Sequence, residues 1–206
     1  MSAVLDFIKN GGVMMYPLIL CSIVLIAIII ERFITLKKAS KDGEALMEQV
    51  RAAYKGPEDM AKTIAICQEF GGPVGRMFAR GIKNAKRDAD AIEMAMEQEA
   101  SNELPALEQY LPLIKTIVNI APLLGLLGTI AGMIASFRAA SKSGLSNPTQ
   151  VLGGISEALI STATGITLAI VGFIFFNYFS QLSKRVVEDM EYYGAELVNH
   201  ITGRID

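Results

Sequence analysis

The chain alternates between long apolar runs and charged segments. Three stretches, residues 10–30, 116–137 and 151–179, together contain only one Asp, Glu, Lys, Arg or His, which is Glu157. A hydrocarbon core about 30 Å thick needs about 20 apolar residues in a helix, because unpaired backbone amides are too costly there for an open structure. The pattern therefore predicts an all-α integral membrane protein, with transmembrane helices at residues 13–36, 113–138 and 151–179.

The segment between the first two spans, residues 37–112, is charged and has apolar positions that recur at helical spacing. We expect several helices in this segment. Breaks are predicted at Gly56-Pro57 and at residues 71–73, because glycine permits unusual backbone angles and proline removes a hydrogen-bond donor.

A further helix is predicted from the capping-box spacing of Asp90 and Glu93, running on into the second span with bends at Pro105 and Pro112. Beyond the third span, residues 180–206 carry an apolar stripe at spacings of three and four, formed by Val186, Met190, Tyr193, Leu197 and Ile201. We expect these helical extensions to pack together outside the bilayer. The alternative is an amphipathic helix that lies on the lipid surface.

Basic residues mark the same side of all three spans: Arg32, Lys37, Lys38, Lys41, Lys115, Lys184 and Arg185. Because basic flanks stay in the cytoplasm, segments 37–112 and 180–206 are predicted to be cytoplasmic. The N-terminus, residues 1–12, and the connection 139–150 are predicted to be periplasmic. The first span is interpreted as a retained helix, since it is too long for a signal peptide and lacks an A-x-A-like cleavage site.

Composition narrows the class of function. The chain has 206 residues, 51% of them hydrophobic, a formal net charge of −2 and no Trp. A nucleic-acid binder would show a basic excess, so nucleic acid is not an expected partner. Cys21 and Cys67 belong to no CxxC or Cys/His cluster, and His200 is the one histidine. No phosphate loop, metal cluster or nucleophile–base set is apparent, so we expect neither an enzyme nor a cofactor.

Glu157 is the exceptional residue of the spans. A carboxyl at membrane depth normally faces a wet cavity or a partner, because an ionised carboxylate is costly in hydrocarbon. Glu157 lies about 9 Å inside the start of the third helix, and it shares one face with Gly153, Ser161 and Thr164. The alternative interpretation is a carboxyl that only bonds a neighbouring helix.

The second span carries a stripe of small and hydroxyl residues at spacings of three and four: Pro122, Gly125, Thr129, Gly132 and Ser136. Such a stripe lets helices approach closely, although a GxxxG pair such as Gly128 and Gly132 more often marks packing than function. Thr129 lies about 13 Å from Arg138, and Thr162 about 16 Å from Val151, along their helices. In an antiparallel pair the two threonines should therefore lie at similar depth.

Hydroxyl groups can hold water in a pore but do not titrate at physiological pH. A complete proton relay needs another acid. Either Glu157 performs every proton transfer in the spans, or a second polypeptide supplies the missing group.

Two motifs connect these features to a known family. Residues 121–133, APLLGLLGTIAGM, resemble the central motif of the MotA/TolQ/ExbB proton channel family, and residues 155–165, ISEALISTATG, continuing to Asn177, are similar to its other signature. Glu31-Arg32 at the end of the first span also fits, whereas the cytoplasmic segment adds little. Most relatives have Pro where this chain has Val171, which makes the local shape of the third span an open question.

The resemblance implies an ExbB/TolQ-like subunit, typically arranged as a homopentameric ring around the single membrane helices of an ExbD- or TolR-like partner. That partner's helix carries an aspartate, and a TonB- or TolA-like third protein can complete the assembly. By motif match, Thr129 and Thr162 correspond to pore-lining threonines and Glu157 to an intramembrane glutamate. Ser161, Thr164, Gly125, Ser136 and Pro122 are further candidates for the pore lining. The implied activity is a proton-driven motor in the bacterial inner membrane.

Three alternatives stay open at this stage. MotA-like stators have four spans, which disfavours that branch for a chain with three. A membrane scaffold without transport would use Glu157 and the threonines only to join helices. Sodium could replace the proton, although Na⁺ sites usually gather more oxygen ligands than Thr129 and Thr162 provide.

Overall fold

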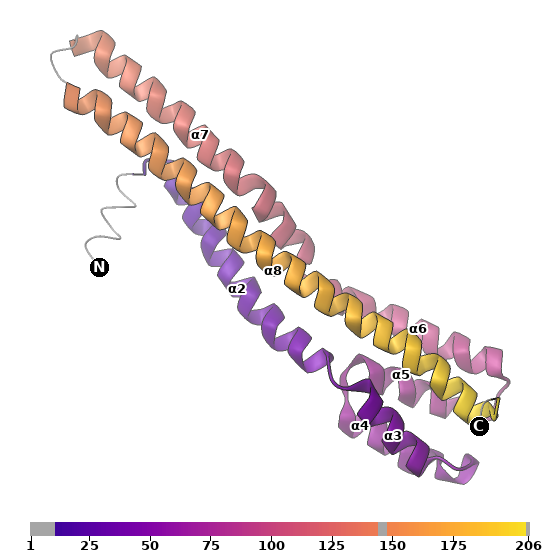
Figure 1. The fold of residues 1–206 in the computed structure, drawn as a ribbon. Helices are drawn as coiled ribbons and strands as arrows, with labels where there is room; N and C mark the ends of the chain where they lie inside the picture. Colours follow the sequence, from indigo (N-terminus) through magenta and orange to yellow (C-terminus); the bar gives the residue numbers. More distant parts are fainter. Residues whose placement is uncertain (1–10, 144–147, 205–206) are drawn as a thin grey trace. The chain divides into compact units, whose positions relative to one another are not determined.

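A computed structural model describes residues 11–143 and 148–204, and every regular element in those ranges is helical (Figure 1). In chain order they are α2 (Met15–Ala39), α3 (Gly43–Ala53), the 3-10 helix η1 (Pro57–Asp59), α4 (Met60–Phe70), α5 (Gly72–Lys83), α6 (Ala89–Glu108), α7 (Leu111–Ser143) and α8 (Pro148–Thr202). Within the described residues, three helical stretches are long and apolar enough to cross a membrane. The all-α class and the three candidate spans are thus confirmed.

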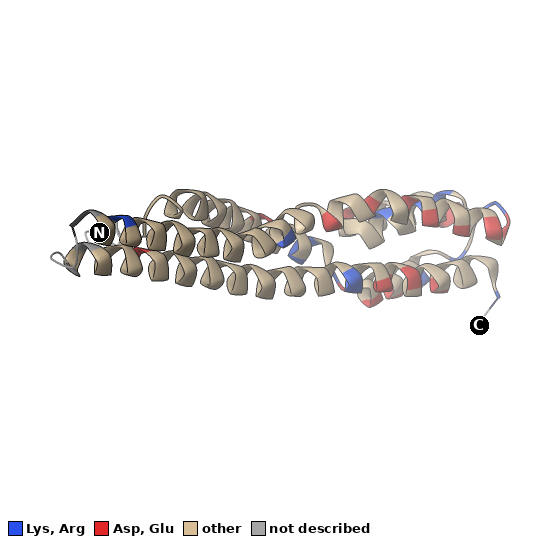
Figure 2. Ribbon diagram, turned by 90° about the horizontal axis from the view of Figure 1, so that it is seen from above, with Lys and Arg blue, Asp and Glu red and all other residues tan. Residues whose placement is uncertain are grey.

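The chain divides into two compact units. The first, here called the apolar unit, comprises Met1–Glu31 and Tyr110–Asn177, and the second, the charged unit, comprises Arg32–Gln109 and Tyr178–Asp206. Helices α2 and α8 each contribute to both units. Figure 2 shows that most Lys, Arg, Asp and Glu residues belong to helices of the charged unit.

The apolar unit is held together by small residues at the centre of its helix contacts. Its buried core contains Met15, Leu18, Ala121 and Ala169. Helices α7 and α8 run antiparallel, and a Cβ added at Gly165 would overlap the carbonyl oxygen of Ala121. Large side chains such as Leu18, Leu25 and Ile114 are also buried, but many others are at least half exposed: Leu123, Leu126, Phe137, Leu159 and Phe173. This inverted pattern suits helices whose outer surface meets lipid.

The charged unit has the opposite arrangement, with large apolar side chains inside. Phe78, Ile82, Ile92 and Leu197 are completely buried. The predicted breaks are confirmed, since η1 begins at Pro57 and α4 ends at Phe70. Gly71 and Gly72 have φ angles of 66° and 70°, which strongly favour glycine.

The apolar stripe of the C-terminal part of α8 belongs to this core. Val186, Met190 and Leu197 are no more than 2% exposed. The stripe therefore packs against protein, and the alternative of a helix lying on the lipid surface is not supported.

Polar contacts fix the ends of several helices in the charged unit. The guanidinium of Arg76 pairs with the carboxylate of Glu103, joining α5 to α6. Arg32, 1% exposed, donates from Nη1 to the carbonyl of Ala106 at 2.9 Å. That carbonyl lies in the last turn of α6, where helical carbonyls lack intrahelical partners, so Arg32 satisfies an otherwise unpaired acceptor.

The prediction of one helix running from Asp90 into the second span is wrong. Helix α6 ends at Glu108, Tyr110 adopts a positive φ of 64°, and α7 begins at Leu111. The break lies at Gln109 and Tyr110, and Pro112 is in the first turn of α7, where a missing N–H costs no helical hydrogen bond. The predicted capping box also fails, because Asp88 is the N-cap and its side chain makes no capping hydrogen bond.

Two other expectations concern the third span. Helix α8 continues without interruption past Val171, which answers the question that the missing proline raised.

The connection predicted at 139–150 is shorter than expected, because α7 extends to Ser143 and α8 begins at Pro148. Its residues 144–147, and residues 1–10 of the predicted N-terminal segment, lie outside the described residues.

Candidate functional site

Two threonines from different helices meet inside the apolar unit. The Oγ1 atoms of Thr129 on α7 and Thr162 on α8 are within hydrogen-bond reach of each other. The carbonyl oxygen of Gly125 lies 2.9 Å from the Thr162 hydroxyl, across the helix contact, and 3.3 Å from the Thr129 hydroxyl, one turn along α7, so either hydroxyl can donate to it. Both side chains are half-buried. The expectation that these threonines lie at similar depth is confirmed.

Close packing of the two backbones brings the hydroxyls together. A Cβ at position 125 would lie 3.0 Å from the Cα of Thr162 and 3.1 Å from the carbonyl oxygen of Ser161. At Gly165 an added Cβ would lie 3.1 Å from the Cα of Gly125. Glycine at both positions lets a side chain of α8 reach a backbone carbonyl of α7, which a larger residue would cover.

Ser161 lies beside this pair but has a different environment. Its side chain is completely buried, and its Oγ is without a hydrogen-bond partner among the described residues. A Cβ at Gly128 would overlap that oxygen. The Ser161 hydroxyl is therefore enclosed between α7 and α8 in the single chain.

Other predicted pore residues make contacts of a structural kind. The Ser136 hydroxyl contacts the carbonyl oxygens of Gly132 and Val151, both at 3.0 Å, and so links α7 to the first turns of α8. The Thr164 hydroxyl donates to the carbonyl of Ile160 in its own helix, at 2.8 Å. Pro122 is half-buried in α7, one turn before Gly125.

Glu157 does not join the threonine pair. Its carboxylate lies against the backbone of Gly12, where an added Cβ would overlap Oε1. Gly12 has a φ of 72° and immediately precedes the first turn of α2. Along α8, Glu157 is about 7.5 Å from Thr162. The polar face predicted for the third span is therefore divided between two places, the hydroxyl pair and the contact with Gly12.

The contact between Gly12 and Glu157 was not predicted from the sequence. Gly12 precedes the first span, and no periodic pattern connects it to a residue of the third. The signal available was the pair Gly11-Gly12 at the start of an apolar run, where glycine often marks a close backbone approach. The packing of the start of α2 beside α8 is needed to identify Glu157 as the side chain that occupies the space beside Gly12.

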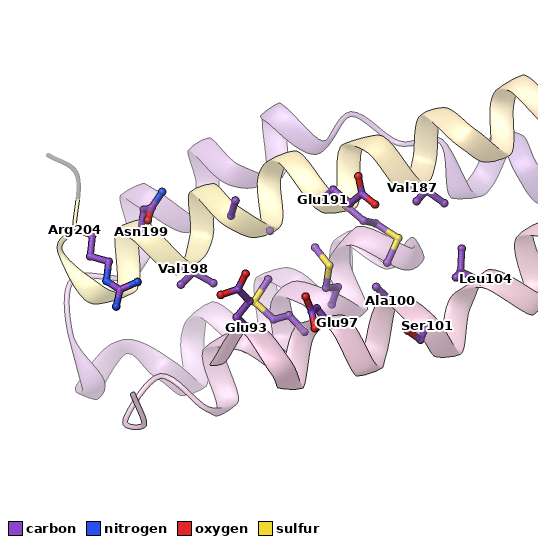
Figure 3. Close-up of a pocket in the computed structure, with 15 residues that line it drawn as sticks. Glu93, Glu97, Ala100, Ser101, Leu104, Val187, Glu191, Val198, Asn199 and Arg204 are labelled. Atoms are coloured by element: carbon purple, nitrogen blue, oxygen red, sulfur yellow. The ribbon is translucent and has the colours of Figure 1, made fainter. Parts of the chain in front are cut away.

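The charged unit contains a groove lined by glutamate and methionine side chains, unlike the hydroxyl groups of the apolar unit. It has a volume of about 540 Å³ and is lined by parts of α5, α6 and α8 (Figure 3). Glu93, Glu97 and Glu191 are exposed at this groove, whereas its three methionines, Met77, Met96 and Met190, are buried. The groove is not lined by any His, Cys or Lys residue.

Metal binding and the reactivity of the Cys67 thiol can be assessed from the described residues. No group of three His, Cys, Asp or Glu side chains in the described ranges could hold a metal ion. Cys67 in α4 is buried, and burial raises the pKa of its thiol to about 11. The thiol is therefore protonated at neutral pH and a poor nucleophile. The hydroxyl pair and Glu157 remain the strongest candidates for function.

Comparison with known proteins places these features in a family. Residues 71–192 match the model of the MotA/TolQ/ExbB proton channel family. The chain is 34% identical over 179 residues to a Synechocystis protein named biopolymer transport protein ExbB-like 3, covering 85% of this chain and 84% of the relative. It is 31% identical over 186 residues to the Tol-Pal system protein TolQ of Haemophilus influenzae, covering 84% and 80%.

A more distant relative extends over nearly the whole chain. A biopolymer transport protein ExbB homolog of Methanothermobacter thermautotrophicus is 27% identical over 202 residues, covering 97% of this chain and 69% of the relative. The family match includes α7 with Thr129 and the part of α8 that holds Glu157 and Thr162. The chain is a multi-pass membrane protein that belongs to the MotA/TolQ/ExbB proton channel family, and within that family it is similar to ExbB and TolQ.

Proposed function

We propose that this chain is the channel subunit of an ExbB/TolQ-type motor that uses the proton gradient across the bacterial inner membrane. The observation that carries the proposal is the hydroxyl pair, Thr129 and Thr162, held at the carbonyl of Gly125. Three oxygen atoms from two apolar helices gather there. Such a cluster can hydrogen-bond water or an acid from a partner, but it cannot itself release a proton at neutral pH.

The spans have no titratable group beside the threonine pair, and this absence is our reason for proposing a partner that supplies one. Apart from Glu157, residues 116–137 and 151–179 contain no Asp, Glu, Lys, Arg or His. Glu157 lies against Gly12, about a turn and a half of α8 away from Thr162. We therefore assign the titrating group beside the threonines to an aspartate on the single membrane helix of an ExbD- or TolR-like protein. Movement of that helix would perform mechanical work, through a TonB- or TolA-like third protein.

The proposed assembly is a homopentamer around the partner helices. In this arrangement Thr129 and Thr162 donate hydrogen bonds to the partner's carboxylate, and Glu157 shapes the electrostatic field at one end of the path. A charge in a site with little water interacts more strongly than it would in bulk solvent. Protonation and release of the partner aspartate would then change its attraction to the threonine pair.

The proposed orientation places the N-terminus in the periplasm and the charged unit in the cytoplasm. The support is the cluster of basic residues that follows the apolar part of α2, namely Lys37, Lys38 and Lys41. A membrane-impermeant thiol reagent applied to intact cells tests this directly. The cysteine of Lys62→Cys, at an exposed position of α4, should remain unlabelled until the cells are opened.

The functional test is proton flux in vesicles that contain the chain and its partner. Thr129→Val, Thr162→Val and Glu157→Gln preserve approximate shape but remove a hydroxyl or a charge. Thr167→Val is the matched control, because the Thr167 hydroxyl donates within its own helix to Ala163, at 2.8 Å, on an exposed face. We expect at least about tenfold lower flux for the two pore variants, the size of one lost charge-assisted hydrogen bond, and unchanged flux for the control.

The alternatives correspond to distinct results. If flux is absent in the wild type while the assembly is intact and correctly oriented, the chain acts as a scaffold. If flux follows a sodium gradient and ignores the pH gradient, the driving ion is Na⁺. If Thr167→Val lowers flux as much as Thr162→Val does, the hydroxyl pair has no special role.

A further inference from the structure

A small pocket lies in the charged unit where two helices change character. Helix α2 is free of charged residues up to Ile30 and carries Lys37 and Lys38 in its last turn. Helix α8 is uncharged from residue 158 until Lys184. The pocket, here called the junction pocket, has a volume of about 240 Å³ and is lined by Phe33, Lys37, Ser40, Tyr178 and Leu182.

The residue pattern around the pocket is the one expected at a membrane surface. Both helices are apolar on one side of the pocket in sequence and charged on the other, as expected where hydrocarbon gives way to headgroups. Phe33 and Tyr178 are exposed aromatic residues at this level. Aromatic residues, tyrosine in particular, are enriched at the headgroup level, where an apolar ring and a polar end both find suitable surroundings.

The lining combines the groups that recognise a phosphate with those that contact an acyl chain. Lys37 provides an ammonium group, and Ser40 and Tyr178 provide hydroxyl donors. Phe33 and Leu182 supply apolar surface beside them. The Lys37 Nζ lies 6.0 Å from the centroid of the Phe33 ring, so the cation is over the aromatic side of the pocket.

The neighbouring lysines do not have the same position. Lys41 Nζ donates to the carbonyl of Phe70 and lies 5.1 Å from the centroid of the Phe70 ring, so it is engaged in protein contacts. Lys38 is exposed and does not line the pocket. Lys37 forms no ion pair within the part of the chain that the structure describes. Its charge is therefore available to an anion from outside the chain.

We propose that the junction pocket binds the phosphate of an anionic phospholipid, with Lys37, Ser40 and Tyr178 as donors and Phe33 and Leu182 against the lipid's apolar part. A charge-assisted hydrogen bond is about twice as strong as a neutral one, so Lys37 dominates the affinity. The site is independent of the proposed proton path.

The test measures lipid binding to the purified full-length chain by native mass spectrometry. The probes are phosphatidylglycerol, phosphatidylcholine and free glycerol phosphate. Lys37→Gln is compared with Lys38→Gln, which removes the same charge from the same helix turn outside the pocket. We expect Lys37→Gln to weaken phosphatidylglycerol binding about tenfold and Lys38→Gln to weaken it no more than about threefold. Lys37→Arg should restore most of the binding.

The result that overturns the site is an equal loss in Lys37→Gln and Lys38→Gln, which indicates attraction to general surface charge, or no loss in either. Equal, Lys37-dependent affinity for free glycerol phosphate would overturn the lipid assignment in favour of a soluble anion. Tyr178→Phe separates contact from folding, because it removes one donor and retains the ring. A weaker phosphatidylglycerol affinity with an unchanged melting temperature supports the pocket, whereas unchanged affinity removes Tyr178 from the proposal.

Discussion

The two units of this chain are built by opposite rules, although the same helices, α2 and α8, contribute to both. In the apolar unit, small residues occupy the contact between α7 and α8, and many large ones such as Leu123 and Phe137 are exposed, although Leu18 of α2 is buried. In the charged unit, large side chains such as Phe78 are buried. The physical reason is the solvent. Water drives large apolar groups inward, whereas lipid does not distinguish a leucine from its own chains.

This difference has a consequence for function. Helices α7 and α8 are held at close backbone distance, and that proximity is what opens the Gly125 carbonyl to the Thr162 hydroxyl, beside the Thr129 hydroxyl of α7 itself. A core of large side chains would separate the two backbones and bury the site. Polar chemistry at membrane depth thus depends on the small-residue packing around it.

The largest expected effect is a loss of unfolding free energy when a large buried side chain of the charged unit is removed. Phe78→Ala removes a completely buried ring, so we expect the charged unit to lose about 3–5 kcal/mol of unfolding free energy. Leu123→Ala in the apolar unit removes a side chain that is 63% exposed, and its loss should be below about 1 kcal/mol. Hydrogen exchange measured by mass spectrometry resolves the two units separately. Comparable losses in both variants would contradict the comparison.

The second test adds side-chain volume at a helix contact of the apolar unit, whereas the first removes it. Gly165→Ala places a Cβ against the Ala121 carbonyl oxygen, where backbone cannot yield easily, and should cost about 1–3 kcal/mol. Gly153→Ala is the control on the same helix, because a Cβ there would find no atom within 4 Å. That variant should be neutral or slightly stabilising, since alanine favours a helix. Detergent unfolding of both proteins provides the measurement.

Much of this organisation could be predicted from the sequence, because local chemistry decides it. Hydropathy identified the three spans, and the glycine and proline residues near 56 and 71–73 identified helix breaks. Simple rise per residue placed Thr129 and Thr162 at the same depth. Pro112, by contrast, is predicted to bend a continuous helix, whereas the structure has a break at Tyr110 and places Pro112 in the first turn of α7.

Contacts between distant segments could not be predicted in the same way. The position of Glu157 depends on Gly12, and the second partner of Ser136 is the carbonyl of Val151 on another helix. Neither contact follows from periodicity, because each requires the register of two packed helices. The sequence therefore identified the polar residues of the spans but could not divide them between the hydroxyl pair and other contacts.

The ion pair between Arg76 and Glu103 should stabilise the charged unit only modestly. Glu103 is 8% exposed and pairs with Arg76, and Glu103→Gln should cost about 1 kcal/mol, a modest value because the Arg76 side chain is 53% exposed. The pairing raises the pKa of the Arg76 guanidinium, and the main cause is the hydrogen bonding in which Arg76 donates to the Glu103 carboxylate. Glu97→Gln is the control, an exposed glutamate on the same helix. Equal melting temperatures for the two variants would show that the pair contributes nothing.

The smallest effect is expected at the hydroxyl pair, and it is the most informative about the apolar unit. In a double-mutant cycle of Thr129→Val and Thr162→Val, the coupling free energy should be about 0.6 kcal/mol, as for other hydrogen bonds between membrane helices. Either threonine can donate to Gly125, so one hydroxyl can keep that carbonyl paired when the other is removed. Unfolding in mixed micelles measures the cycle. A coupling above about 2 kcal/mol would mean that the pair holds the helices together, and the loss of proton flux in the same variants would then reflect altered structure. A small coupling with a large loss of flux would instead assign the two hydroxyls to the ion path.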